Sequence, residues 1–360
     1  MIQKLRRLIG PFLTWAGADL RFFHWIACPI GLFLFLYAGN AYPFHLESRC
    51  EEKSGPIPIV NQTPIQLLFL QPIPDKAETL PKGQGSLRLN IAITNTLLSG
   101  SSTNYEGVVD MEMIRASLDV QYGIVPGLEM GVCLPFVYRY SGIMDHAILE
   151  FEEAFNAEGS IRKDQVENEY EYCVKRNDTA FISGNGEKSS GIGDLALWIK
   201  GKVWDEGDIL PCLSTRLGVK IPTGDEDRAL GSGKADYGFG LLLQKDMRGL
   251  TAYLNADVIF PGDAFDQEGV TLSEFYEIML GAEYKLSSRL SLLAQVNCIA
   301  RPFKQTGLQM LDRRIYDSLV GINYLTEGGI SVQGGAIEDF KNSGNAGADI
   351  TFFLTVGKGF

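Results

Sequence analysis

Few residues of this 360-residue chain are of the types that usually do chemistry. Only three histidines occur, His24, His45 and His146, and none lies in a segment with the alternating pattern of a β-strand. A serine or aspartate hydrolase needs a base positioned beside its nucleophile. We therefore expect no enzyme activity, no cofactor and no metal site, and a membrane hydrolase is the remotest functional hypothesis.

One stretch superficially resembles a phosphate-binding loop. "PTGDEDRALGSGK" (222–234) contains glycines followed by a lysine. A phosphate-binding loop would need glycine where Arg228 stands and serine or threonine where Ala235 stands, so the sequence argues against nucleotide binding. The acidic triplet 225–227 could hold a divalent cation or bridge lipopolysaccharide, but a solvated acidic loop is the expectation.

Charged residues of both signs alternate with apolar residues along many segments, and this spacing places them together on one face of a strand. In the lumen of a barrel, such mixed bands more often brace the wall through salt bridges than select one ion. The residues that we expect to face a lumen are Arg88, Glu112, Arg115, Asp119, Glu129, Asp194, Lys200, Lys202, Arg216, Lys220, Asp236, Asp257 and Glu277.

The elements that carry these charges are predicted β-strands. In "SLRLNIAITNTLL" (86–98), leucine and isoleucine hold nearly every second position and polar residues stand between them. This pattern indicates a strand with one apolar and one polar face. Each predicted strand is long enough for a tilted membrane crossing of about 9–11 residues. The predicted strands are 86–98, 110–122, 128–138, 193–204, 209–221, 235–246, 249–260, 272–285, 288–300, 313–325, 328–338 and 346–360.

The connections between these strands alternate in length. Tight turns occur at 123–127 and 326–329, for example, whereas the gap at 139–192 is long. Short turns at one end and long loops at the other are typical of outer-membrane barrels, with the short turns in the periplasm. The sequence thus predicts an all-β fold: a transmembrane antiparallel up-and-down β-barrel of about 12 strands. Apolar residues at helical spacing near 144–156 predict a short helix in the longest loop.

Aromatic residues support the same topology. Tyr122 and Tyr324 would lie at the periplasmic end of apolar faces, and Tyr237 and Phe260 at the outer end. Aromatic girdles at both interfaces are expected of membrane barrels. The alternation continues to the last residue, and a final strand ending on Phe360 resembles the C-terminal insertion signal of outer-membrane barrels.

The region before the barrel (86–360) divides into two expected segments. Basic residues followed by the apolar run "WIACPIGLFLFLYA" predict a signal peptide over 1–41, with an uncleaved anchor as the alternative. Removing it takes away four basic residues and one acidic residue and changes the net charge from −12 to −15. Such an acidic chain has no electrostatic footprint for nucleic acid. The proline-rich segment 42–85 is expected to enter the lumen as a plug or to lie in the periplasm as a tail.

Several stretches resemble known families. "GIGDLALWIKGKV" (191–203) and "LSTRLGVKIPTGDEDRALGSGKADYGFGL" (213–241) resemble a strand and hairpin of barrels associated with the meta-pathway of phenol degradation. "NQTPIQLLFLQPIP" (61–74) and "LPFVYRYSGIMDHAILEFEEAFN" (134–156) resemble a related, uncharacterised family of Gram-negative outer-membrane proteins. The resemblance implies a location in that membrane and an apolar or aromatic solute, and it assigns no catalytic residue.

Two functional hypotheses are therefore favoured over a membrane hydrolase. The first is passive transport or uptake of a small solute, and the second is a structural or surface-interaction barrel with a plugged lumen. In both, the expected partners are outer-membrane lipids, lipopolysaccharide and the outer-membrane assembly machinery. The first adds a small solute, and neither involves nucleic acid.

Overall fold

The computed structural model describes residues 53–142, 170–184, 189–339 and 347–360. The chain divides into two compact units, Met1–Glu52 and Lys53–Phe360, and the second is described here. The predicted signal peptide at 1–41 and the helix predicted near 144–156 lie outside the described residues. Within the described ranges, no helix is long and apolar enough to cross a membrane.

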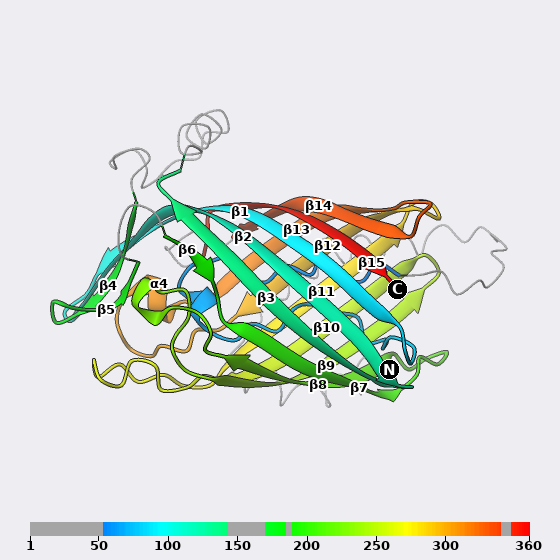
Figure 1. Cartoon of the computed structure of the whole chain (residues 1–360), viewed down its shortest axis with the longest axis horizontal. Coiled ribbons are helices and arrows are strands. Elements are labelled where there is room, and N and C mark those ends of the chain that lie inside the picture. Colours follow the sequence, from blue (N-terminus) through cyan, green and yellow to red (C-terminus); the bar gives the residue numbers. More distant parts are fainter. Residues whose placement is uncertain (1–52, 143–169, 185–188, 340–346) are drawn as a thin grey trace, which may run out of the picture. The chain divides into compact units, whose positions relative to one another are not determined.

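Twelve long antiparallel strands form a closed barrel (Figure 1). Each strand pairs with the next strand of the ring, and β15 pairs with β1 to close it. Each of the twelve predicted strands overlaps one of these, so the predicted all-β barrel is confirmed. The strands are β1 (Gly85–Ser101), β2 (Tyr105–Val125), β3 (Leu128–Tyr140), β7 (Leu195–Trp204), β8 (Cys212–Ile221), β9 (Asp236–Met247), β10 (Leu250–Phe260), β11 (Phe275–Lys285), β12 (Leu290–Ile299), β13 (Ile315–Leu325), β14 (Ile330–Asp339) and β15 (Ile350–Gly359).

Three short strands extend the sheet outside the ring: β4 (Glu171–Arg176), β5 (Thr179–Ser183) and β6 (Ser189–Ile192). β4 pairs with β2 and with β5, whereas β6 pairs with β3. The sequence analysis assigned this stretch to a loop. The signal that it missed is the turn Asn177-Asp178, where both φ angles are positive, 46° and 64°. Asparagine and aspartate favour such two-residue hairpin turns.

Side-chain exposure alternates along the strands. On β1, Leu87 and Leu89 are 43% and 41% exposed, whereas Asn90 is 2% exposed. On β3, Met130 and Phe136 are exposed and Glu129 is buried. The outer surface is therefore apolar, as contact with lipid requires, and the polar face turns to the lumen.

Short turns join the strands at one end of the barrel, here called the turn end, and the opposite end is called the loop end. At the turn end, Arg248 and Gly249 connect β9 to β10 with φ angles of 52° and 91°. Phe360 also lies there, because its N–H donates to the carbonyl oxygen of Gly85 at 2.9 Å and Gly85 donates back at 2.8 Å. A Cβ on Gly85 would stand 2.3 Å from the Phe360 ring. Glycine at this position therefore leaves room for the Phe360 ring as it lies in this structure.

Three short helical turns complete the described elements: η1 (Gln66–Leu68), η3 (Glu226–Arg228) and α4 (Gln309–Asp312). η1 belongs to the chain before β1, and the other two lie in connections at the loop end. None of them contributes to the ring.

Candidate functional site in the barrel lumen

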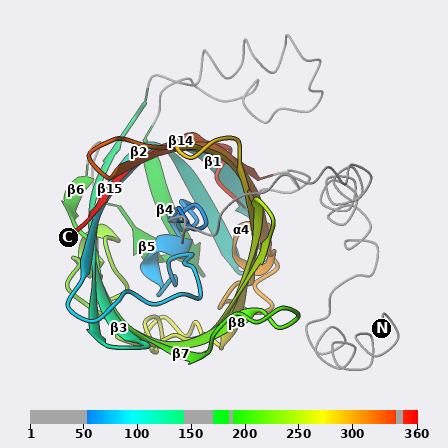
Figure 2. The ribbon, with the colours of Figure 1, turned by 90° about the vertical axis from the view of Figure 1, so that its right-hand side faces the viewer.

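Residues 53–84, here called the lumenal loop, rise inside the barrel from the turn end to the loop end and return (Figure 2). At its tip, Thr63 Oγ1 accepts a hydrogen bond from the N–H of Ala348, just before β15, at 3.1 Å. On its way out, the N–H of Gly83 donates to the carbonyl oxygen of Gly123 at 2.8 Å. The loop therefore spans the length of the lumen twice.

The rising limb binds the wall through backbone N–H groups. The N–H of Gly55 donates to Glu283 Oε2 at 3.3 Å, and the N–H of Ile57 donates to Gln295 Oε1 at 3.0 Å. Pro56 has no N–H to satisfy. Pro56 and Pro58 therefore reduce the number of wall acceptors that this limb needs.

The returning limb is held by wall groups of both signs. Its N–H groups donate to wall acceptors, namely Leu70 to Asp236 Oδ2 at 2.7 Å, Asp75 to Asn255 Oδ1 at 2.9 Å and Leu80 to Glu129 Oε2 at 2.7 Å. Its carbonyl oxygens accept from wall cations, namely Leu68 from Lys220, Ile73 from Arg216 and Lys76 from Lys200. Most of these contacts use the loop backbone, so they depend little on the loop's side chains.

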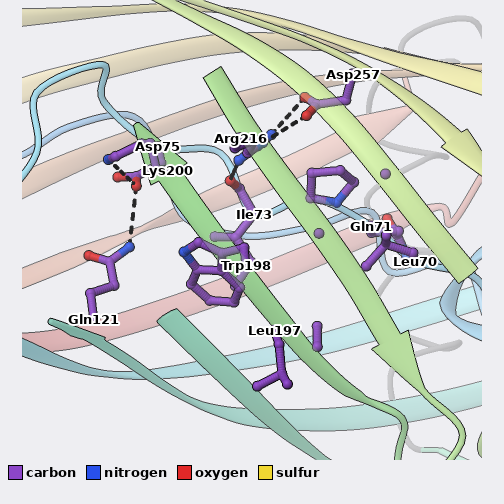
Figure 3. Close-up of a pocket in the computed structure, with 14 residues that line it drawn as sticks. Leu70, Gln71, Ile73, Asp75, Gln121, Leu197, Trp198, Lys200, Arg216 and Asp257 are labelled. Carbon is purple, nitrogen blue, oxygen red and sulfur yellow. Dashed lines mark hydrogen bonds and ion pairs between the residues drawn. The ribbon is translucent and has the colours of Figure 1, made fainter. Parts of the chain in front are cut away.

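Asp75 is the exception, because its side chain forms an ion pair with the wall (Figure 3). Lys200 Nζ lies 2.8 Å from Asp75 Oδ2 and 2.8 Å from Glu129 Oε1. Gln121 Nε2 also donates to Asp75, at 3.2 Å. Burial raises the pKa of the Asp75 carboxyl, but the charges of Lys200 and Arg88 outweigh it and hold the pKa at about 2.

Three further wall cations pair with wall carboxylates. Arg216 Nη2 lies 2.6 Å from Asp257 Oδ2 (Figure 3), and its Nε donates to Asp257 Oδ1 at 2.7 Å. The Nζ atom of Lys220 lies 2.9 Å from Asp194 and 3.1 Å from Asp236. The guanidinium of Arg88 similarly pairs with Asp119.

Most residues expected to face the lumen do so, and they pair across strands: Arg88, Asp119, Glu129, Asp194, Lys200, Arg216, Lys220, Asp236 and Asp257. Glu277 borders a cavity beside Asp257, its partner in the β10–β11 register. Arg115 also faces the lumen, where it borders a cavity. Lys202 stands apart at the turn end and pairs with the exposed Asp205.

The assignment of Glu112 to the lumen is wrong. In β2, Glu112 shares the parity of Leu118 and Tyr122, which are 42% and 45% exposed on the outer surface. It lies opposite Tyr140 of β3. Its charge suggested the lumenal face, but the parity of the strand places it on the other face, where it is buried.

An apolar cluster at the loop end, here called the outer cap, covers the tip of the lumenal loop. Phe69 packs edge-on against Phe275 and Phe303, with ring centroids 6.1 and 5.7 Å apart. Phe303 stacks on Phe265, and the cluster extends to β2, β4, β5 and α4. Burial of these aromatic and aliphatic side chains stabilises the loop tip without any charge.

Cavities remain between the lumenal loop and the wall. One lies between residues 70–75 and strands β7–β9, beside Trp198 (Figure 3). Its wall includes Gly218 and Gly238, where the absence of side chains makes room for Leu70. Another, with about 600 Å³ of empty volume that is partly open to solvent, lies against β2, β3, β7 and β8.

Comparison with protein families shows to which family the chain belongs. The profile described as "Protein of unknown function (DUF3187)" matches residues 44–360. The chain belongs to the DUF3187 family. Among curated proteins, no match was found. The predicted link with phenol-degradation barrels stays a prediction.

Several solved structures are similar to this DUF3187 protein, and one of them matches it with a TM-score above 0.5. The COG4313 outer membrane channel from Pseudomonas putida F1 is 16% identical, with a TM-score of 0.56 over 81% of this chain and 100% of that chain. The P. putida toluene transporter TodX is 9% identical, with a TM-score of 0.41 over 77% and 90%. The Ralstonia pickettii toluene transporter TbuX is also 9% identical, with a TM-score of 0.40 over 78% and 90%. The COG4313 match establishes the outer-membrane channel fold.

The sequence pattern did not indicate two polar residues of this DUF3187 lumen, Asp75 and Asn255. A signal for Asp75 existed, because it is the only carboxylate between residues 53 and 77. The acidic triplet 225–227 is exposed, as a solvated loop would be. Over the described part of the chain, no group of acidic, histidine or cysteine residues could hold a metal ion.

Proposed function

We propose that this chain is a Gram-negative outer-membrane barrel through which small solutes diffuse passively, and that the lumenal loop controls their passage. One observation carries the proposal: the wall does not need the loop to balance its charges. Lys200 keeps Glu129, Arg216 keeps Asp257 and Lys220 keeps Asp194 if the loop moves. A buried charge left without its partner would cost several kcal/mol, and this arrangement avoids that cost.

The apolar residues of the loop limit how it moves. Ile57 and Ile59 are buried against Leu293 and Phe353, and the tip is buried in the outer cap. Complete expulsion into water would expose these side chains and lose their burial energy. The proposal is therefore a displacement within the lumen, in which the returning limb separates from the wall and joins the existing cavities into a path.

The outer surface supports the proposed location and partners. The apolar exposed band suits outer-membrane lipid and lipopolysaccharide, and the channel fold shared with the COG4313 protein supports the same membrane. Phe360, 71% exposed at the end of the last strand, is available to the assembly machinery during insertion. The sequence resemblance to phenol-degradation barrels supports an apolar or aromatic solute.

A second candidate is a structural barrel whose lumen stays closed. It is favoured by the contacts of the lumenal loop with the wall, which include hydrogen bonds from both limbs and aromatic packing near the tip. The two functions differ in one consequence, because only the channel has open states.

Conductance in planar bilayers distinguishes the two candidates. We expect the full chain to conduct weakly and a variant lacking residues 42–80 to conduct strongly, with faster entry of benzyl alcohol into liposomes. The variant Lys202→Met, which removes the turn-end charge that pairs with the exposed Asp205, is the control and keeps the weak conductance. Equal conductance of the full chain and the deletion variant would contradict the proposal.

A further inference from the structure

Two arginines lie side by side on the lumenal face of β2 and β3. Arg115 stands opposite Val137 in the register of these strands, so Arg139 is its diagonal neighbour. Both arginines line the same cavity, which is partly open to solvent. This places Arg115 against a space that the lumenal loop does not fill, with Arg139 on the same lumenal face.

Neither arginine has a carboxylate partner among the residues that the structure describes. Arg115 Nη1 donates to Ser117 Oγ at 3.3 Å. The Nη atoms of Arg139 donate to the carbonyl oxygens of Arg228 and Ala229 at 3.1 and 2.7 Å, and its guanidinium lies 5.0 Å from the centroid of the Tyr172 ring. In contrast, the lumenal cations Arg88, Lys200, Arg216 and Lys220 each have an acidic partner.

The other charges at this cavity do not compensate for the arginines. Lys220 and Asp194 both border it, and they pair with each other and with Asp236. Together these groups contribute three positive and two negative charges, so an excess positive charge remains. A cation in a low-dielectric site is stabilised by an anion or by water, and Arg115 keeps donors free for either.

Most of the remaining cavity surface is apolar. Val60, Leu67 and Ile73 contribute from the lumenal loop, and Cys133, Val137 and Leu230 from the wall side. A strongly hydrated inorganic anion would lose water against these side chains and gain nothing from them. An anion with an apolar body gains both the ion pair and the apolar burial.

We propose that Arg115 forms a subsite for small organic carboxylates with an apolar body. The planar guanidinium matches the two oxygens of a carboxylate. The apolar body lies against the loop and wall side chains, and Arg139, already engaged by carbonyl oxygens, adds positive potential without binding directly. This inference rests on the proposed function, because it assigns the class of solute that occupies the lumen.

Equilibrium binding to the full chain in detergent tests the subsite, with radiolabelled benzoate and its neutral analogue benzamide as probes. We expect the unmodified protein to bind benzoate about tenfold or more tightly than benzamide, because a hydrogen bond to a charged group contributes strongly. Arg115→Gln removes this preference, Arg115→Lys retains most of it, and Lys202→Gln, which alters a charge at the turn end, leaves it unchanged. Equal binding of the two probes to the unmodified protein overturns the inference without any variant.

Flux of the same two probes into liposomes separates this inference from the proposed function. Binding that depends on Arg115, with entry of both probes no faster than into empty liposomes, supports the subsite and contradicts transport. Rapid entry of benzamide, with benzoate binding that is indifferent to Arg115→Gln, supports transport and overturns the subsite. Rapid benzoate entry that falls with Arg115→Gln, while benzamide entry is unchanged, supports both.

Discussion

The lumenal loop is held in two chemically different ways. Along residues 71–84 of the returning limb, here called the shaft, backbone groups and Asp75 contact Lys200, Arg216 and other charged wall residues. At the outer cap, Phe69 is buried among Phe275 and Phe303. If the shaft moves away, the wall cations keep their carboxylate partners in the wall. If the cap opens, its apolar side chains lose their burial and gain no other contact. The comparison indicates that the shaft is the part that moves and the cap is the anchor.

The largest expected effect follows from removing Lys200, the wall cation that forms an ion pair with the shaft. Lys200→Met leaves Asp75 and Glu129 as neighbouring buried carboxylates without their shared partner. We expect the free energy of unfolding to fall by about 4 kcal/mol. Urea denaturation in detergent measures it, with Lys202→Met as the control, because an ion pair with an exposed partner contributes only about 0–1 kcal/mol. Equal losses from the two variants would show that the shaft is not a distinct region.

The outer cap responds to loss of volume. Phe69→Ala removes a ring that is 3% exposed and contacts two other rings, and we expect a loss of about 3 kcal/mol in the free energy of unfolding. Because no charge is involved, the loss is the same at pH 2 and at pH 5. A loss that varied with pH across that range would mean that the cap and shaft are not independent.

Asp75 gives the smallest effect and the sharpest contrast with the cap. Its pKa is lowered from 3.8 to about 2, so its contribution is complete above pH 3.8 and is lost as the pH falls toward 2. Asp75→Asn should cost about 2 kcal/mol at pH 7, and Lys200 keeps Glu129 in that variant. The variant should also lose less stability than the unmodified protein between pH 4 and pH 2. Parallel pH profiles of the two proteins would contradict a stabilising ion pair between Asp75 and Lys200.

The sequence predicts the strands of the barrel better than the contacts between the lumenal loop and the wall, for a physical reason. Which face of a strand meets lipid depends on local alternation, as with Leu87 and Leu89, so the outer surface could be predicted from neighbours in the sequence. Asp75 and Lys200 are 125 residues apart. Their pairing depends on the stagger of the strands and on the path of the loop, which no local pattern encodes. The Asn177-Asp178 hairpin was the one missed element with a local signal.

The most direct test of the central claim, that movement of the shaft opens the lumen, is a reversible lock on the returning limb. Ala77 is buried in contact with the native Cys212 of β8, so Ala77→Cys places two thiols together across the boundary between loop and wall. Single-channel recording of this variant is compared under oxidising and reducing conditions, with the unmodified protein as the control. We predict that openings disappear on oxidation and return on reduction only in the variant. Openings that persist in the variant after the disulfide has formed, shown by mass spectrometry, would contradict the account.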